Sequence, residues 1–561
     1  MRNFFLVFYF FSFNFLVSQN LSLNHSNIES ALRFKQLNGD FTKKFSFTIK
    51  PLNISKFRDS VNNYLGYKKI IYNSNKFEFS LLPIDYFIEL NSNYPYNRNN
   101  GSMIPNRGYQ HILSAGFFFK LGPLSIKFNP EHQFSQNKKF EGFWEGHYPI
   151  IWQRRYRLWN HIDSPERFGE KRHNQRLLGQ SNIKLNWKKI SLGFSNENIW
   201  WGPSIRNSIM MSNHATGFKH LTFNTSSPID TKIGSFEWQV ISGRLESSTY
   251  TPPGTDKFYA GQRLYFEKIN QMGQMNDWRY FQGYIFTYSP SFIDGLSLGF
   301  IRWVQMYRSM LEGQYTWFKG KPDYFPIFKN LFRNNDLYAD YESHTDQAAG
   351  IFFRWLWADA KAEIYGEFNL NDAKLNFRDF LQDTDHSRAV TFGLQKIFKF
   401  NSGGDYLFQW EWTQMEQSAS RLVRNANSWY EHHWIYHGYT NFGEVLGSGI
   451  GPGSNSHYLS LSRVNGLDNY GISIEIVDND NDFYYEAFTD SKDFRRYWKD
   501  LNLHLNFQKK FKNLLLSSKL IFIKSLNYQW ALDESVSSEY FKPGIDKNNF
   551  HMSLKLSYLF K

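Results

Sequence analysis

The sequence predicts an all-β fold, a transmembrane antiparallel β-barrel of about 18 strands that follows a small N-terminal helical element. Three observations predict this fold. Apolar and polar residues alternate through most of the 561 residues, aromatic residues make up 19% of the chain and gather near strand ends, and the last strand alternates up to Phe560. A mean hydropathy of −0.54 is compatible with a barrel, because only every second residue of a barrel strand faces lipid.

The composition excludes several other classes of protein. The chain has no cysteine, which excludes a disulfide scaffold, a thiolate zinc site, an iron–sulfur cluster and a cysteine nucleophile. The aromatic content excludes an intrinsically disordered chain, because such chains contain few aromatic residues. The 64 Lys and Arg against 51 Asp and Glu give a formal net charge of +13.

Residues 1–18 have the pattern of a secretory signal peptide. Arg2 supplies a positive charge, and the apolar run from Phe4 to Val17 ends at the small residue Ser18. This run is shorter than the ~20 residues that a membrane-spanning helix needs. We therefore predict export with cleavage near Ser18, and any crossing of the membrane must come from strands.

Residues 19–75 are predicted to form a small helical element. Ser26 and Glu29 have the spacing of a capping box, and Gly39 is placed to end the helix that follows. Apolar residues also recur at helical spacing from Phe57 to Leu65, before Gly66. Two short helices are expected in this region.

Residues 76–561 are predicted to form the barrel. Leu501, Leu503 and Leu505, for example, alternate with polar residues, so one face of that strand is apolar and the other polar. A soluble sandwich shows the same alternation, but here it continues without a domain break, and closure removes the sheet edges that lipid cannot tolerate. The alternating strand that ends at Phe560 resembles the insertion signal of outer-membrane barrels, although Lys561 follows it.

Three blocks of the sequence, in order along residues 75–500, resemble the Wzi-type capsule assembly family. The first block is Asn99-Asn100-Gly101-Ser102-Met103 with Gly108-Tyr109-Gln110, and Leu124-Ser125-Ile126 to Pro130-Glu131. The second contains Gly179-Gln180-Ser181, the run Asn196 to Pro203, Met211-Ser212-Asn213-His214-Ala215 with Gly217-Phe218, and Pro228 to Glu237. The third contains Gly438-Tyr439-Thr440-Asn441, Gly447 and the run Gly451 to Ser456.

This resemblance implies an outer-membrane, lectin-like barrel with the small helical element of residues 19–75 on its periplasmic side. Such a barrel binds capsular or other surface polysaccharide and helps to assemble or anchor the capsule at the cell surface. The implied partners are that polysaccharide, of acidic type if the basic residues contact it, together with lipopolysaccharide and outer-membrane lipid. Nucleic acid is not expected as a partner of an exported barrel. The oligomeric state and the identity of the polymer stay open.

Two groups of residues are the main candidates for carbohydrate contact. Trp200 and Trp201 precede a sharp turn, and sugars stack on such rings, although the rings also suit the interfacial girdle. Basic residues between Arg154 and Arg176 could bind the uronate carboxylates or phosphates of an acidic polymer. The alternatives are that they neutralise lipopolysaccharide phosphates or pack against the lumenal carboxylates Glu363, Glu367 and Glu411. The full predicted set is Trp200, Trp201, Asn213, His214, Arg154, Arg155, Arg157, Trp434, Tyr439 and Asn441.

No cofactor, metal site or catalytic residue is predicted. His432, His433 and His437 lie close in sequence, but spacing alone does not make ligands converge. Asp478, Asp480 and Asp482 copy the start of a calcium loop without its later glycine and glutamate, which indicates a solvated outer turn. G-x-S-x-G and H-E-x-x-H motifs are absent. The remaining alternatives are a porin-like saccharide channel, an outer-membrane hydrolase and a scaffold subunit of another outer-membrane machine.

Overall fold

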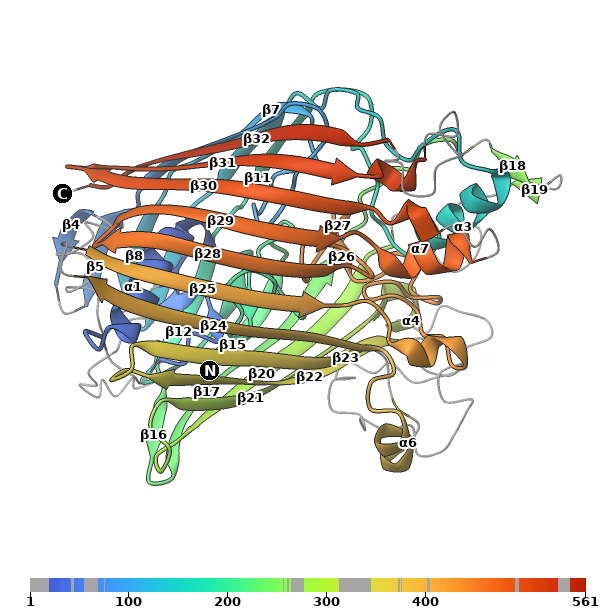
Figure 1. The fold of residues 1–561 in the computed structure, drawn as a ribbon. Coiled ribbons are helices and arrows are strands. Elements are labelled where there is room, and N and C mark those ends of the chain that lie inside the picture. Colours follow the sequence, from blue (N-terminus) through green and yellow to red (C-terminus); the bar gives the residue numbers. More distant parts are fainter. Residues whose placement is uncertain are drawn as a thin grey trace, which may run out of the picture.

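The structure, a computed structural model, describes residues 20–41, 45–54, 69–74, 76–255, 257–259, 262–263, 277–311, 345–371, 374, 376–400, 404–489, 494–532 and 545–560. In this part of the chain, one large antiparallel sheet contains 24 strands. β32 (Lys547–Tyr558) pairs with β6 (Ile84–Asn91), so the last strand meets the beginning of the sheet and closes a barrel (Figure 1). The predicted all-β barrel is confirmed.

Several strands of this sheet continue one another across a short break. They are β5 (Phe77–Leu81) with β6, β7 (Gly108–Ser114) with β8 (Phe117–Leu121), β9 (Leu124–Phe128) with β10 (Glu131–Ser135), and β11 (His173–Leu177) with β12 (Asn182–Trp187). The number of spanning strands, about 18, therefore stays a prediction. The others are β4 (Lys69–Asn73), β13 (Ile190–Ser195), β15 (His220–Thr225), β16 (Ile229–Thr231), β17 (Gly234–Leu245), β20 (Arg279–Pro290), β21 (Leu296–Tyr307), β22 (Asp346–Trp357), β23 (Ala362–Asn371), β24 (Arg388–Phe400), β25 (Gly404–Gln414), β28 (Asn455–Asn465), β29 (Asp468–Asp478), β30 (Lys499–Phe511) and β31 (Leu514–Leu526).

Short elements accompany the barrel. Four two-stranded pairs are β1 (Asn20–Leu21) with β3 (Leu52–Asn53), β2 (Ile49–Lys50) with β14 (Trp200–Trp201), β18 (Phe258–Tyr259) with β19 (Gln262–Arg263), and β26 (Thr440–Asn441) with β27 (Glu444–Val445). The described helices are η1 (Leu23–His25), α1 (Ser26–Leu37), α3 (Pro149–Trp159), α4 (Arg308–Leu311), α6 (Phe377–Gln382), η5 (Ala419–Leu422), α7 (Asn481–Phe488), η6 (Phe494–Arg496) and η7 (Tyr528–Trp530). Within the described ranges, no helix is long and apolar enough to cross a membrane.

The wall of the barrel is apolar outside and polar inside. On β30, Leu501, Leu503 and Leu505 are 38–40% exposed, whereas Asn502 and His504 are buried at 1–2%. A protein in water would have the opposite arrangement, because exposed apolar surface costs free energy there. The outside of the wall therefore fits the acyl chains of a bilayer. As predicted, the apolar residues of the alternating pattern face outward and the polar residues face the lumen.

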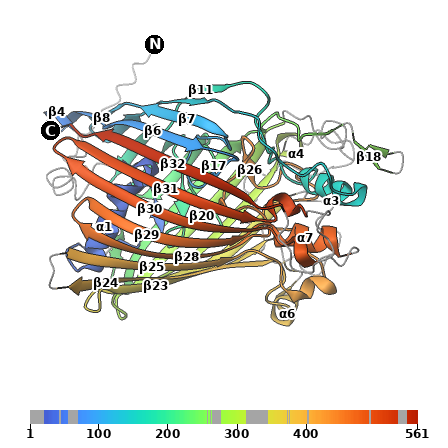
Figure 2. The same cartoon turned by 45° about the horizontal axis from the view of Figure 1, so that its top comes forward.

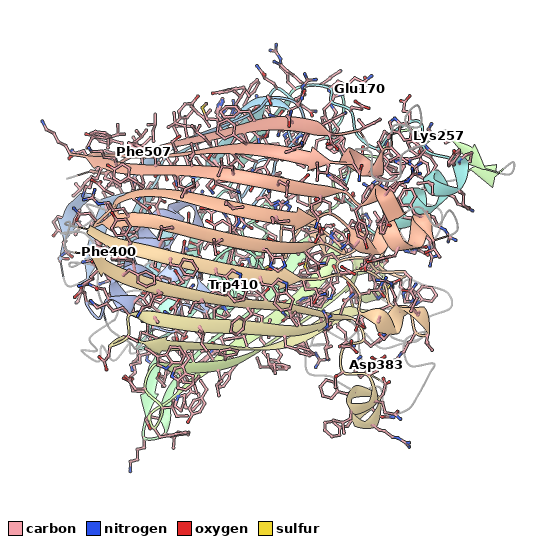
Figure 3. The ribbon with its side chains drawn as sticks, in the orientation of Figure 1. Glu170, Lys257, Asp383, Phe400, Trp410 and Phe507 are labelled. Carbon is pink, nitrogen blue, oxygen red and sulfur yellow. The ribbon has the colours of Figure 1, made fainter. Side chains whose placement is uncertain are left out.

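Exposed aromatic side chains mark one end of the wall. Figure 3 shows Phe400 and Phe507 near the same end of the barrel, with Trp410 midway along the wall. Such a ring of aromatic residues lies at the interface between lipid and water. Its exposed members include Trp187, Phe398, Phe400, Phe507, Phe511 and Tyr558.

The two ends of the barrel carry connections of different length. Short turns join the strands at one end, such as those at Gly466 and Lys512, both with positive φ. The other end carries the long connections with α3, α6 and α7 (Figures 1 and 2). Outer-membrane barrels have short periplasmic turns and long extracellular loops, so the end with short turns is called the inner end and the other the outer end.

Helix α1 lies inside the barrel near the inner end, as both ribbon views show (Figures 1 and 2). It is the helix predicted from the pattern at Ser26. Its Ile28 and Leu32 belong to an apolar cluster with Leu467, Leu515 and Leu559 of the inner end. The second predicted helix, Phe57 to Leu65, and the predicted signal peptide lie outside the described residues. The boundaries 1–18, 19–75 and 76–561 stay predictions.

A charge on the lipid-facing side of the wall should oppose insertion of the barrel into a membrane. Ile474→Lys places a cation at the middle of β29, where a charge facing lipid costs about 2–4 kcal/mol. We expect a lower folded fraction in phospholipid vesicles, measured as the heat-sensitive gel mobility of the barrel. Ile474→Val is the matched control and should fold like the wild type; equal folding of the Lys variant would contradict a lipid-facing position.

Candidate functional site

Two long connections fold back into the lumen at the outer end. These segments, residues 196–219 and 428–454, form what we call the outer plug. Inward-facing residues of β17, β20 and β21 pack against them in one apolar cluster. Its members include Trp201, Ile209, Met210, Met211 and Phe218 of the first segment, Trp429, Tyr430, Tyr439, Val445 and Leu446 of the second, and Ile241, Phe281, Ile285, Ile301 and Trp303 of the wall.

Buried carboxylates of the wall hold the first segment of the plug. Glu411 of β25 accepts hydrogen bonds from the backbone N–H groups of Ile205 at 2.8 Å and Asn207 at 2.7 Å, and also from that of Arg206. The Arg206 guanidinium forms a bidentate pair with Glu475 of β29, at 3.0 and 2.6 Å. Charge-assisted bonds of this kind are the strong ones, and they replace the water that a buried carboxylate has lost.

Arg33 connects helix α1 to the outer plug. Its guanidinium pairs with Glu363 of β23 at 2.7 Å and donates to the Pro203 carbonyl at 2.9 Å. The lumenal carboxylates Glu363 and Glu411 thus pair with α1 and the plug. One alternative for the basic segment, that it packs against these carboxylates, is therefore wrong.

Three predicted contact residues are fully buried in the plug or against it. Trp201 Nε1 donates to Gln239 Oε1 at 2.9 Å. The ring of Tyr439 stacks on Trp303 with centroids 4.0 Å apart, and Asn441 Nδ2 donates to the Thr216 carbonyl. Trp201, Tyr439 and Asn441 are 0% exposed, so a polymer would reach them only if the plug opened.

Four further predicted residues also lie in the plug. The Trp200 ring lies under the Lys50 ammonium at 4.8 Å, so the girdle alternative for Trp200 and Trp201 is wrong. His214 is buried. Its burial, and to a smaller extent the charge of the nearby Arg98, lower its pKa to about 3. Asn213 donates to the Asn99 carbonyl, and the half-buried Trp434 packs beside His433.

The basic segment begins in α3, which packs against α7 at the outer end. The Arg155 guanidinium is 3.5 Å from Glu166 and 3.9 Å from Asp480. Four aromatic rings surround it at 4.9–5.5 Å, from Phe143, Trp159, Phe483 and Trp530. Arg155 therefore joins α3 to α7, whereas Arg154 and Arg157 reach the surface and share Glu486.

A groove of about 290 Å³ opens between α3, η5 and α7; we call it the outer groove. The Arg421 guanidinium lies over the Tyr485 ring at 3.6 Å, and Arg157 pairs with Glu486 at 2.8 Å. The groove thus offers cations, an aromatic ring, amides and carboxyl groups. Its polar lining is Arg157, His161, Gln417, Arg421, Asn425, Asn427, Ser428, Glu431, Asp482, Tyr485, Glu486 and Thr489.

Buried carboxyl groups form the floor of the groove. Asp482 accepts hydrogen bonds from Ser428 Oγ at 2.6 Å and from the Gln417 N–H at 2.9 Å, and burial raises its pKa to about 6. Burial, together with Asp480 and Asp482, raises the pKa of Glu431 well above its usual range. The predicted solvated turn at Asp480 and Asp482 is wrong, because Asp480 caps α7 by accepting from Phe483 N–H and both carboxyl groups are buried.

Of the ten predicted contact residues, Arg157 lines the groove, and Arg154 shares Glu486 with it. Tyr485, Arg421 and the amides of the 417–427 segment were missed. In the sequence, residues 417–427 are only a largely polar stretch, and Tyr485 is only one member of the aromatic pair Tyr484-Tyr485. Neither pattern by itself indicates a binding site. Across the described ranges, no group of three or more His, Asp or Glu is arranged to hold a metal.

Comparison with known families decides the identification. The family described as "Capsule assembly protein Wzi" matches residues 97–469. This chain belongs to that family. The predicted family is confirmed, and the Wzi family together with the apolar outer face of the barrel places the chain in the outer membrane.

The solved structure of one Wzi protein supports the barrel fold of this Wzi-family chain. Wzi of Escherichia coli, described as an outer-membrane, carbohydrate-binding β-barrel involved in group 1 capsule assembly, is 12% identical with a TM-score of 0.58 over 98% of this chain and 100% of that chain. OprD of Pseudomonas aeruginosa is 8% identical with a TM-score of 0.35, over 85% and 92%. A comparison with curated proteins found no match.

The plug of this Wzi-family barrel should depend on Glu411. Glu411→Ala leaves three backbone N–H groups without their acceptor, at a cost of about 1–3 kcal/mol for each buried group. We expect higher ion conductance in planar bilayers and a lower unfolding temperature. Glu411→Gln keeps an acceptor oxygen and should have the smaller effect. Unchanged conductance of the Ala variant would show that Glu411 does not hold the plug.

The stability of the groove floor should depend on pH through Asp482. Its pKa rises from 3.8 to about 6 on folding, so the folded state binds more protons in this range and stability falls as the pH rises through it. We expect α7 to exchange amide hydrogens more readily at pH 7.5 than at pH 5, after correction for intrinsic exchange. The difference should shrink in Asp482→Asn and persist in Asp230→Asn, at the inner end. An unchanged difference in Asp482→Asn would refute this assignment.

Proposed function

We propose that this chain is a non-enzymatic, lectin-like barrel that binds a surface polysaccharide at the outer groove and so helps to hold the capsule at the cell. The observation that carries the proposal is the outer groove itself, which joins an aromatic ring, two arginines and several amides at the end with long connections. Aromatic faces and amide groups match the C–H faces and hydroxyl groups of sugars. The carbohydrate binding described for Wzi of Escherichia coli supports the same function.

An acidic polymer suits the two arginines of the groove. Arg157 and Arg421 lie on its rim, and bidentate arginine contacts are strong with carboxylates and phosphates. Glu431 is buried below them, and its raised pKa reduces the repulsion that a carboxylate would meet there. Weak binding at one repeat unit suffices for retention, because a repeating polymer engages many copies of the protein.

The filled lumen favours a binding protein over the porin-like alternative. Helix α1 and the outer plug occupy the lumen from opposite ends and meet at Arg33 and Pro203. This arrangement supports low conductance. A scaffold role within another outer-membrane machine is compatible with the same fold, and no contact among the described residues favours it.

Lipopolysaccharide is the proposed lipid partner at the outer end. Helix α6 lies beside the barrel there (Figure 1), and its Phe377 and Leu381 are each 60% exposed. The exposed Arg378 is next to Phe377. Apolar side chains beside a cation suit the boundary between acyl chains and phosphate groups.

Removal of groove side chains should weaken polymer binding. We expect Arg421→Gln and Tyr485→Ala each to bind the purified capsular polysaccharide of the source organism about tenfold more weakly, a loss of about 1.4 kcal/mol. Surface plasmon resonance on detergent-purified protein measures this. Arg244→Gln removes an exposed arginine of the outer end that lies outside the groove lining, and it should bind like the wild type. Wild-type affinity of both groove variants would refute the proposed site.

A further inference from the structure

A second polar cavity lies inside the lumen, between α1 and the wall. Its volume is about 370 Å³, within the range of roughly 300–1,000 Å³ that is typical of small-ligand sites. The lining extends from Gly466 and Leu467, at an inner-end turn, to Tyr96 and Arg206 beneath the outer plug. The plug separates this cavity from the outer groove, so a ligand would reach it from the inner end.

Amide and hydroxyl groups dominate the polar lining of this lumenal cavity. They come from η1 and α1, from the segment that follows β6, from the outer plug, and from β7, β25, β28, β29, β30, β31 and β32. Such groups both donate and accept hydrogen bonds, as sugar hydroxyl groups do. The amide and hydroxyl residues are Asn24, Ser26, Asn27, Ser30, Tyr96, Asn99, Asn100, Ser114, Asn213, Gln409, Tyr458, Ser460, Ser462, Asn469, Asn506, Gln508, Ser517, Ser518 and Ser553.

Three of these amides each donate one hydrogen bond and have an acceptor without a partner. The side-chain Nδ2 groups of Asn99, Asn100 and Asn213 donate to the Arg206 carbonyl at 2.7 Å, to Glu89 Oε2 at 3.0 Å and to the Asn99 carbonyl at 3.1 Å. The Oδ1 atom of each has no hydrogen-bond partner among the described residues. Buried polar atoms usually have a partner, so a ligand with hydroxyl donors would complete this group.

The charge of the lining favours an anion. The described lining contains two carboxylates, Asp85 and Glu89, and four cations, Arg98, Arg206, Lys519 and Lys555. Glu475 already binds Arg206, and Lys555 lies 3.7 Å from Asp85. Nη1 of Arg98 has no hydrogen-bond partner among the described residues, and Lys519 lies on the opposite strand β31. Because Glu89 attracts Lys519, these four cations face three carboxylates, Asp85, Glu89 and Glu475. The one positive charge in excess favours a ligand carboxylate beside Arg98 and Lys519.

We infer that the lumenal cavity binds a short acidic saccharide, one or two sugar rings with a uronate carboxylate, that enters from the inner end. Arg98 and Lys519 pair with the carboxylate, and the amide oxygens of Asn99, Asn100 and Asn213 accept from the ring hydroxyls. This inference does not depend on the outer groove. It gives the barrel a periplasmic saccharide site in addition to the one proposed outside.

Isothermal titration of the detergent-purified full chain with glucuronate tests the inference. We expect saturable binding by the wild type, at least fivefold weaker binding of glucose, which lacks the carboxylate, and at least fivefold weaker binding of acetate, which lacks the ring. Arg98→Gln and Lys519→Gln should each reduce glucuronate affinity at least fivefold. Heat-sensitive gel mobility reports whether each variant has folded, and the second variant serves if the first does not.

Arg421→Gln separates this site from the outer groove. It should leave glucuronate binding unchanged while it weakens polymer binding, and Arg98→Gln should show the reverse. Absence of glucuronate binding by the folded wild type would overturn the inference, as would wild-type affinity in both lumen variants. Equal binding of acetate would reduce the cavity to a simple anion site, which also contradicts it.

Discussion

The structure depends on how the lumen satisfies its buried carboxylates. A barrel in lipid turns its polar side chains inward, and a carboxylate removed from water needs charged or hydrogen-bonding partners. Glu363, Glu411 and Glu475 are buried on the wall. Some of these partners belong to the wall itself, such as Arg354 for Glu363 and Tyr365 for Glu411. Others come from α1 and the outer plug, through Arg33, the backbone N–H groups of residues 205–207 and Arg206.

This requirement explains why two distant parts of the chain meet inside the barrel. Arg33 contacts both a wall carboxylate and the Pro203 carbonyl, so α1 and the plug are fixed by the same set of charges. Gly202 has a positive φ, and a Cβ atom there would collide with Glu367. The close approach of backbone to carboxylate is thus possible only with glycine at this position.

The filled lumen divides the polar surface of the barrel into two separate parts. On the outer side, the aromatic cluster around Arg155 joins α3 to α7 and shapes the outer groove. On the inner side, α1 leaves the lumenal cavity against β28, β31 and β32. The chemistry of the two sites differs, since the groove combines an arginine stacked on tyrosine with carboxyl groups, whereas the cavity is rich in amides.

The sequence by itself determined the barrel and its family. Alternation of apolar and polar residues, as from Leu501 to Phe507, is a local property, because each strand residue faces the side opposite to its neighbour. The first helix was equally readable from the pattern at Ser26. What only the tertiary structure decided is which polar residues remain accessible. Trp201, Tyr439 and Asn441 have the residue types of a sugar site, yet long connections fold back and bury them, and the groove residues Arg421 and Tyr485 meet from segments more than sixty positions apart. Burial of a loop depends on contacts between such distant segments, and no local period in the sequence records those contacts.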